Sequence, residues 1–154
     1  MLRTRKAFSL IELVIVVVII GIIAAIAIPR FSNASVSAGD SALKGDLNVM
    51  RKAIDTFTTE HGGTLPTLAN IVSDLTLYSD STGTSCQTTQ DSTHIYGPYL
   101  RSVPALSVGA RKGNTGIGAA DGPTIGWIYD AVAGNITANT TTEADASGTL
   151  YNTY

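Results

Sequence analysis

An uninterrupted apolar stretch near the N-terminus constrains this chain more than any other feature. Residues 13–28 read LVIVVVIIGIIAAIAI, without a charged or hydroxyl side chain, and Pro29 follows directly. From Phe8 to Ile28 there are 21 residues, which as a helix rise by about 31 Å. Because this length matches the hydrocarbon thickness of a bilayer, the stretch predicts a helix that can cross a membrane.

One acidic residue, Glu12, lies inside this predicted helix, four residues after Phe8. An ionised carboxylate at the centre of a bilayer costs about 2.5–3.5 kcal/mol, and less near the interface. The first turn of a helix offers a partial positive charge, and a free amino group offers a full one. Cleavage between Ala7 and Phe8 would create such an amine, close to Glu12 of the same chain or of a neighbouring copy.

The run Arg5-Lys6-Ala7-Phe8-Ser9-Leu10-Ile11-Glu12-Leu13, followed by the apolar helix and Pro29, resembles the class III signal of type IV prepilins and type II secretion pseudopilins of the major pseudopilin G kind. The family leader usually ends in Gly, whereas this one ends in Ala7, the next smallest residue. The resemblance implies cleavage after Ala7 by a prepilin peptidase and N-methylation of Phe8. It also implies that the apolar helix assembles with its copies into a filament.

Two plainer explanations compete with this interpretation. A secretory signal would use Ala25-Ile26-Ala27 as its cleavage site and give a mature protein that begins at Ile28. A signal anchor needs only the basic leader and the apolar run. Neither explains Glu12 or the helical pattern that continues past Pro29, so we favour the prepilin interpretation.

Three further residues of this segment are candidates for a role in assembly. Gly21 and Ala25 form a small-xxx-small pair, which lets helix backbones approach closely. The same residues are also common in membrane helices of any kind. Pro29 has no amide hydrogen and clashes with the preceding turn, so we expect it to kink the helix or end it briefly where the chain leaves the membrane.

The length of 154 residues predicts three parts: a leader peptide (1–7), a transmembrane and assembly helix (8–29) and one extracytoplasmic pilin-like globular domain (30–154). Positive charge in the leader favours a single-pass precursor in the inner membrane with its C-terminus outside the cytoplasm. Three of the 10 basic residues lie in the leader, so the mature chain keeps seven against 12 acidic residues. This acidic balance argues against a nucleic-acid partner.

The region after Pro29 predicts an amphipathic helix that packs on a sheet. Its apolar residues recur at spacings of three and four: Leu43, Leu47, Met50, Ile54 and Phe57, with Val36 seven residues before Leu43. The run His61-Gly62-Gly63 predicts the end of this helix. A second helix is expected over 67–77, and a polar loop over 79–93.

Towards the C-terminus, residues 125–130 and 135–138 read as two strands joined by a turn that contains Gly134. We expect Trp127 to fill the space between this hairpin and the amphipathic helix. The fold class is therefore α+β: a long N-terminal helix, half membrane-spanning and half amphipathic, on a small antiparallel sheet, as the resemblance to type IV pilins implies. The segments Gly97-Pro98-Tyr99-Leu100 and Gly126-Trp127-Ile128-Tyr129-Asp130 are similar to elements of the G pseudopilins.

The sequence indicates neither an enzyme nor a cofactor. His61 and His94 are far apart, and no metalloprotease, hydrolase, nucleotide-binding or CxxC motif occurs. The resemblance to secretion pseudopilins would imply a calcium loop, but Asp121 and Asp130 do not reproduce its acidic pattern, so no metal ligand is assigned. Cys86 is the only cysteine and cannot form an intrachain disulfide.

These features predict a structural subunit of a pilus or pseudopilus, in a type IV pilus-like or type II secretion system. The partners that the resemblance implies are copies of the chain, other pilins, the membrane, a prepilin peptidase, an assembly platform protein and an ATPase. The missing disulfide and the two pseudopilin-like segments favour the secretion pseudopilus. The alternative function is a membrane-anchored extracytoplasmic binding module that does not polymerise.

Overall fold

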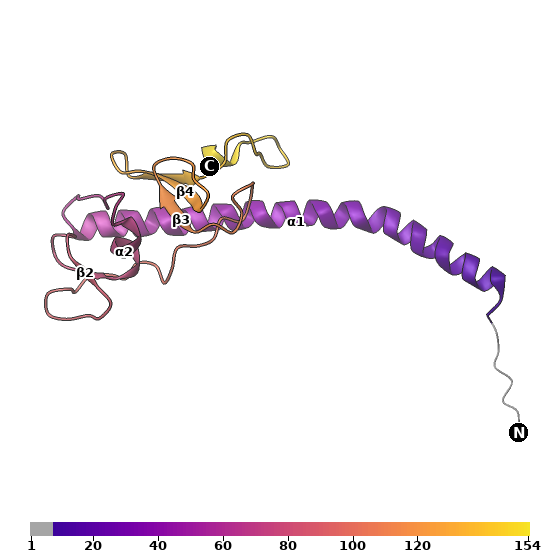
Figure 1. Cartoon of the computed structure of the whole chain (residues 1–154), viewed down its shortest axis with the longest axis horizontal. Helices are drawn as coiled ribbons and strands as arrows, with labels where there is room; N and C mark the ends of the chain where they lie inside the picture. Colours follow the sequence, from indigo (N-terminus) through magenta and orange to yellow (C-terminus); the bar gives the residue numbers. More distant parts are fainter. Residues whose placement is uncertain (1–7) are drawn as a thin grey trace, which may run out of the picture. The chain divides into compact units, whose positions relative to one another are not determined.

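The computed structural model describes residues 8–154, apart from the side chains of Pro29, Ser32 and Asn33. The leader and the predicted cleavage residue Ala7 lie outside the described residues. The elements, in chain order, are α1 (Leu10–Glu60), α2 (Ile71–Thr76), β1 (Tyr78–Ser79), β2 (Cys86–Gln87), β3 (Gly116–Gly118), β4 (Ile125–Asp130), β5 (Asn135–Ala138) and the 3₁₀-helix η1 (Tyr151–Thr153) (Figure 1).

The chain divides into an N-terminal unit, which ends at Val36, and a C-terminal unit, Ser37–Tyr154. Helix α1 belongs to both, and its helical hydrogen bonding runs on through Pro29. Of the two outcomes expected at Pro29, a kink or a brief end of the helix, the brief end does not occur. Proline removes one backbone donor without preventing the flanking turns from remaining helical.

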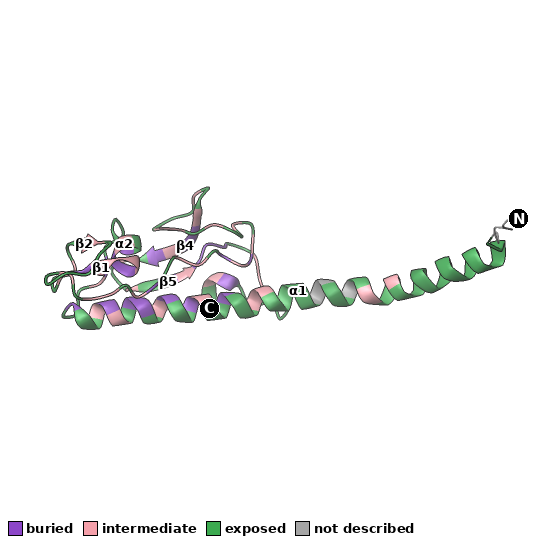
Figure 2. Ribbon diagram, turned by 90° about the horizontal axis from the view of Figure 1, so that it is seen from below, coloured by how far each residue is buried: buried purple, intermediate pink, exposed green. Residues whose placement is uncertain are grey.

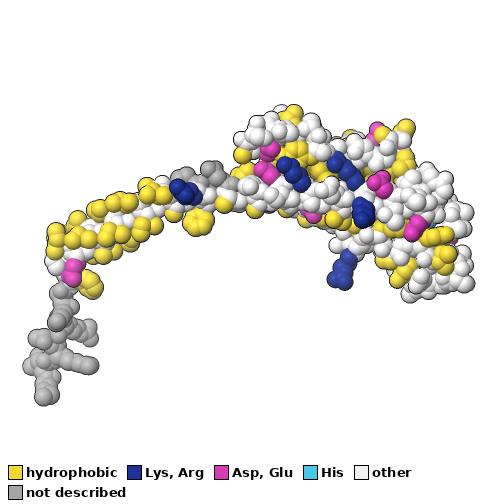
Figure 3. Space-filling view, turned by 180° about the vertical axis from the view of Figure 1, so that it is seen from behind, with side chains coloured by type: hydrophobic (Ala, Val, Ile, Leu, Met, Phe, Trp, Pro, Cys, Tyr) yellow, Lys and Arg dark blue, Asp and Glu magenta, His cyan; other side chains and the backbone are white. Residues whose placement is uncertain are grey.

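In the N-terminal unit, the stretch Leu10–Ile28 is long and apolar enough to cross a membrane, and none of it is buried within the chain. Hydrophobic side chains cover the face of this stretch that is visible in Figure 3. Such a surface is unstable in water, so the helix needs lipid or other helices around it.

The core of the C-terminal unit forms where the second half of α1 meets the sheet. The predicted stripe is confirmed from Leu43 onward, because these five side chains are buried: Leu43, Leu47, Met50, Ile54 and Phe57. Its first predicted member, Val36, is 44% exposed, so the buried stripe begins only at Leu43. The buried positions of α1 face the strands (Figure 2). Trp127 is fully buried in the same core and donates its indole N–H to the carbonyl oxygen of Pro104 at 2.9 Å, as its predicted position between sheet and helix requires.

The end of α1 lies where the sequence predicts it. Helix α1 ends at Glu60, and after His61 the residues Gly62 and Gly63 adopt positive φ angles of 64° and 91°, a conformation that favours glycine. The N–H of Gly63 donates to the carbonyl oxygen of Thr58 at 2.8 Å, as in a Schellman-type end.

The α+β fold class is confirmed. Strands β4 and β5 form the predicted antiparallel hairpin, with Trp127 opposite Ala138 and Asp130 opposite Asn135. The three-stranded sheet β3-β4-β5 is mixed, however, because β3 pairs with β4 in parallel. A parallel neighbour normally requires a long crossover, but β3 is so short that residues 119–124 suffice to return the chain.

Two other segments differ from the sequence prediction. Helix α2 covers only Ile71–Thr76 of the predicted 67–77, because residues 67–70 form a turn in which the N–H of Asn70 donates to the carbonyl oxygen of Thr67 at 3.1 Å. The predicted loop 79–93 contains β2, which pairs antiparallel with β1. Its bend is held by the Asp80 carboxylate, which accepts the N–H groups of Thr82 and Thr84 at 3.2 and 3.1 Å.

Candidate assembly site on the N-terminal helix

Ser9 and Glu12 hold the first turn of α1. The helix begins at Leu10, so Ser9 is its N-cap and Glu12 its third residue. The Glu12 carboxylate accepts the Ser9 N–H at 3.0 Å, and the Ser9 hydroxyl oxygen accepts the Ile11 N–H at 3.3 Å. This reciprocal arrangement is a capping box, which satisfies two of the backbone donors that every helix start leaves open.

The capping box shows that Glu12 also stabilises the start of the helix, a role that its charge alone does not predict. The spacing Ser-x-x-Glu before an apolar run is a known signature of a helix start, so the sequence contained the signal. A carboxylate has about four acceptor positions, and the capping bond uses one of them. Glu12 can therefore keep this bond and accept a second, cationic donor.

Phe8 lies beside this capped turn. Its side chain is 84% exposed, and it directly precedes Ser9, whose N–H bonds Glu12. An amine created on Phe8 would thus be one residue away from the Ser9 N–H, which donates to the Glu12 carboxylate. A neighbouring copy can reach the same exposed carboxylate, so these contacts alone leave open whether the pair forms within one chain or between two.

Gly21 and Ala25 lie on one face of α1, one turn apart, and both are exposed. A Cβ atom added at Gly21 would meet no other atom within 4 Å, so nothing in the chain covers this position. At about 100° per residue, Glu12 and Gly21 lie on opposite sides of the helix, because nine residues separate them. Pro29 follows Ala25 by another turn. Glu12 and the pair Gly21 and Ala25 thus lie on two faces of α1.

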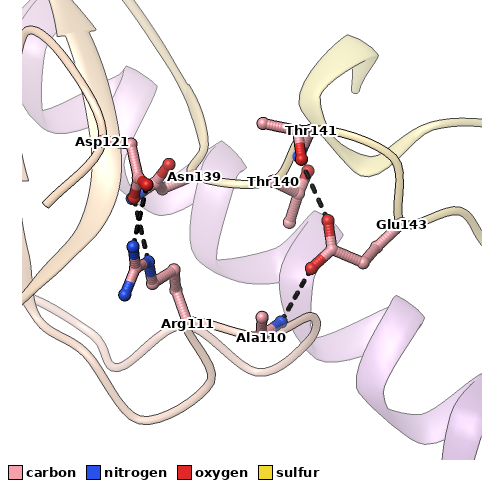
Figure 4. Close-up of a pocket in the computed structure, with 7 residues that line it drawn as sticks. All are labelled: Ala110, Arg111, Asp121, Asn139, Thr140, Thr141 and Glu143. Atoms are coloured by element: carbon pink, nitrogen blue, oxygen red, sulfur yellow. Dashed lines mark hydrogen bonds and ion pairs between the residues drawn. The ribbon is translucent and has the colours of Figure 1, made fainter. Parts of the chain in front are cut away.

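The carboxylates that were considered as calcium ligands already have partners within the fold. Asp121 accepts two hydrogen bonds from the Arg111 guanidinium, at 2.9 and 2.8 Å, and a third from the Asn139 amide at 2.9 Å (Figure 4). These bonds, that of Arg111 foremost, lower the pKa of Asp121 to about 2. Asp130 accepts the N–H groups of Val132 and Ala133 in the hairpin turn, at 2.9 and 3.1 Å.

The pocket that contains Asp121 has a volume of about 280 Å³. Across it, the Glu143 carboxylate accepts the N–H of Ala110 at 2.9 Å and that of Thr141 at 3.1 Å, and these bonds lower the pKa of Glu143 (Figure 4). Within residues 8–154, no group of three or more His, Cys, Asp and Glu side chains is arranged to hold a metal ion. The hydrogen bonds that line this pocket connect two loops, so these side chains have a structural role.

His61 and Cys86 have different hydrogen-bond partners. His61 is buried, with Nδ1 2.7 Å from the carbonyl oxygen of Phe57 and Nε2 2.9 Å from that of Asp80. It therefore joins the end of α1 to the loop after β1. The Cys86 thiol donates to the buried Asp74 carboxylate at 3.4 Å, a contact that the sequence did not indicate. Burial, together with this bond, raises the pKa of Cys86 to about 11, which keeps the thiol protonated at neutral pH.

The comparison with known protein families decides what the capped apolar helix is. The family described as "Prokaryotic N-terminal methylation motif" matches residues 2–28. The chain carries this motif. The match includes Phe8, Glu12 and the whole apolar stretch, so the predicted prepilin-type N-terminus is confirmed.

Two curated relatives are similar to part of the chain. The chain is 50% identical over 52 residues to the type IV major fimbrial protein FimA of Dichelobacter nodosus, which is 34% of this chain and 33% of that protein. It is 34% identical over 59 residues to the type II secretion system core protein G of Pseudomonas aeruginosa, which is 38% of this chain and 42% of that protein. The matches thus span well under half of these relatives, and no solved structure is significantly similar to the chain.

Proposed function

We propose that this chain is a structural subunit of a filament, in a type IV pilus-like or type II secretion system. The observation that carries the proposal is the methylation motif over residues 2–28, joined to an apolar helix that nothing in its own chain covers. The curated relatives are named as a fimbrial protein and a secretion-system core protein, and neither name is that of an enzyme. The whole-chain function rests on this N-terminal similarity together with the chemistry of the helix.

In the proposed pathway, a prepilin peptidase cleaves between Ala7 and Phe8, and Phe8 is then N-methylated. The precursor lies in the inner membrane with the C-terminal unit outside the cytoplasm. An assembly platform protein and an ATPase transfer the helix from lipid into a periplasmic or surface filament, where copies of α1 and other pilins surround it. The division into leader (1–7), assembly helix (8–29) and globular domain (30–154) belongs to the same proposal.

The two faces of α1 favour polymerisation over a closed dimer. Glu12 lies opposite Gly21 and Ala25, so one copy meets different neighbours through the two faces. Contacts between unlike faces of identical chains generate rings or open helical filaments. A monomeric membrane-anchored binding module, the competing function, needs neither face.

The charge of Glu12 can be tested separately from its capping bond. Glutamine at the third helical position also accepts the N-cap N–H, so Glu12→Gln keeps the capping box and removes only the charge. We expect normal peptidase cleavage and a loss of assembled filaments of at least tenfold, measured by immunoblots of processed chain and of sheared fibres. Ser9→Ala is the matched control, because it removes the Ser9 hydroxyl bond to Ile11 and keeps the charge, and it should still assemble.

Two results would contradict this proposal. Equal loss of cleavage and assembly in Glu12→Gln would mean that the carboxylate serves the peptidase. Unchanged assembly would remove the ion pair from the mechanism. Deletion of the gene, with surface fibres and secretion of folded exoproteins as separate readouts, then distinguishes a pilus from the secretion pseudopilus that the sequence favours.

A further inference from the structure

The turn between β4 and β5 presents an apolar side chain to solvent. Val132 is 92% exposed, the highest value among the large apolar residues of the described chain. The turn is nevertheless well defined, because Asp130 accepts the N–H groups of Val132 and Ala133 and its carbonyl oxygen accepts the N–H of Gly134 at 2.8 Å. Single exposed apolar side chains are common on protein surfaces, but the hydrogen bonds of this turn hold Val132 in one position. A side chain that is already held in place loses little conformational entropy when it contacts another surface.

A groove of the same unit offers a complementary surface. It has a volume of about 560 Å³ and is lined by Val72 and Thr76 of α2, by Arg101, Ser102 and Val103, and by Thr115 and Gly116 at the start of β3. Val72 is 46% exposed, so an apolar side chain in this groove would cover a valine that the chain leaves open. Among the described residues, Arg101 takes part in no ion pair.

Val132 cannot occupy the groove of its own chain. The residues of the turn and of the groove do not overlap, and the exposure of Val132 shows that its own groove does not receive it. Gly116 pairs with Ile125 at the start of β4, whereas Val132 follows the end of that strand. Over five residues, β4 separates these two points by about 17 Å.

We propose that Val132 of one copy inserts into the groove formed by Val72, Arg101 and Val103 of the next copy. Charge complementarity supports a second copy as the occupant, because Asp130 precedes Val132 by two residues and can face Arg101. A contact between different surfaces of identical chains generates a ring or an open helical filament, and the proposed function requires the filament. This inference rests on the proposed filament function and specifies which parts of the C-terminal units meet.

Cysteine cross-linking of the full chain tests this contact. In a Cys86→Ser background, assembled filaments would be oxidised with Val132→Cys and Ser102→Cys in the same chain. Disulfides form when the two Cα atoms lie about 4.4–6.8 Å apart, and a short bismaleimide covers slightly longer separations. We expect a ladder of dimers, trimers and larger species on a denaturing gel. A mixture of the two single variants should give dimers only.

The controls distinguish a wrong contact at Val132 from a wrong filament function. The matched control places the first cysteine at another exposed apolar residue, Ile95, and leaves Val132 unchanged. The pair Ile95→Cys with Ser102→Cys should give no ladder. Dimers from Val132→Cys alone would show that turn meets turn, and fibres without a ladder would show that the contact does not exist; either result overturns this inference and leaves the filament function standing. Absence of fibres from the unsubstituted chain would overturn both.

Discussion

The hydroxyl group of Tyr129 offers a clean test of how the hairpin is held to the rest of the C-terminal unit. Tyr129 is 1% exposed, and its hydroxyl donates to the carbonyl oxygen of the buried Pro66 at 3.0 Å. Tyr129→Phe removes the donor without removing ring atoms, so the main effect is a buried carbonyl group without its partner. Leaving such an acceptor unpaired costs about 1–3 kcal/mol in the free energy of unfolding.

The assay is urea unfolding of the full chain in detergent, followed by the fluorescence of Trp127, the only tryptophan. With a urea dependence of about 1–3 kcal/mol per molar, the midpoint should fall by about 1 M. Tyr99→Phe is the matched control, because the Tyr99 hydroxyl donates to the exposed Glu60 carboxylate, which water can solvate in its place. This control should change stability by less than about 0.5 kcal/mol. Equal effects of the two substitutions would refute the argument from the buried carbonyl.

Two further perturbations probe the hairpin turn and the pocket. Gly134→Ala should lower the free energy of unfolding by about 1–3 kcal/mol, because φ is +69° and the added Cβ would lie 2.6 Å from the Leu65 Cδ2 atom. Thermal unfolding should show a smaller loss of stability for the control Gly148→Ala, where φ is +88° and nothing lies within 4 Å of the added Cβ. Equal losses of stability in the two variants would exclude the clash with Leu65 as a cause. The pKa of Asp121 is lowered to about 2, so its contribution to stability should be complete above about pH 4 and disappear as the pH falls toward 2. Carboxyl titration by NMR should show this low pKa, and Arg111→Gln should return it toward its ordinary value; an unchanged titration would exclude the guanidinium as its cause.

Where periodicity and turn chemistry were strong, the sequence predicted the fold well. The stripe from Leu43 to Phe57 is buried, α1 ends before the glycines, and β4 pairs with β5 as expected. These features are local, because each depends on residues within one or two turns or on the two sides of one hairpin. The methylation motif was recognisable for the same reason.

The features that were missed depend on contacts between distant segments or on weak local patterns. Strand β3 is Gly-Ile-Gly, which carries no alternation, and its parallel pairing with β4 becomes visible only in three dimensions. The bond between Cys86 and Asp74 joins the short strand β2 to α2, and no spacing in the sequence indicates it. The capping box was different, because its signature was present but the charge of Glu12 drew the interpretation toward a partner outside the turn.

The capping box also bears on how assembly can be reversible. In lipid and in a filament the apolar side chains of α1 have similarly apolar surroundings, so their burial contributes little to the difference between the two states. A bare carboxylate would make the membrane state costly and extraction one-way. The bond from the Ser9 N–H, a charge-assisted hydrogen bond worth about 1.5–3 kcal/mol, offsets part of that cost before any neighbour arrives. The ion pair that we propose between Glu12 and the Phe8 amine would then add to a carboxylate that is already oriented, which would keep the free-energy difference between lipid and filament small.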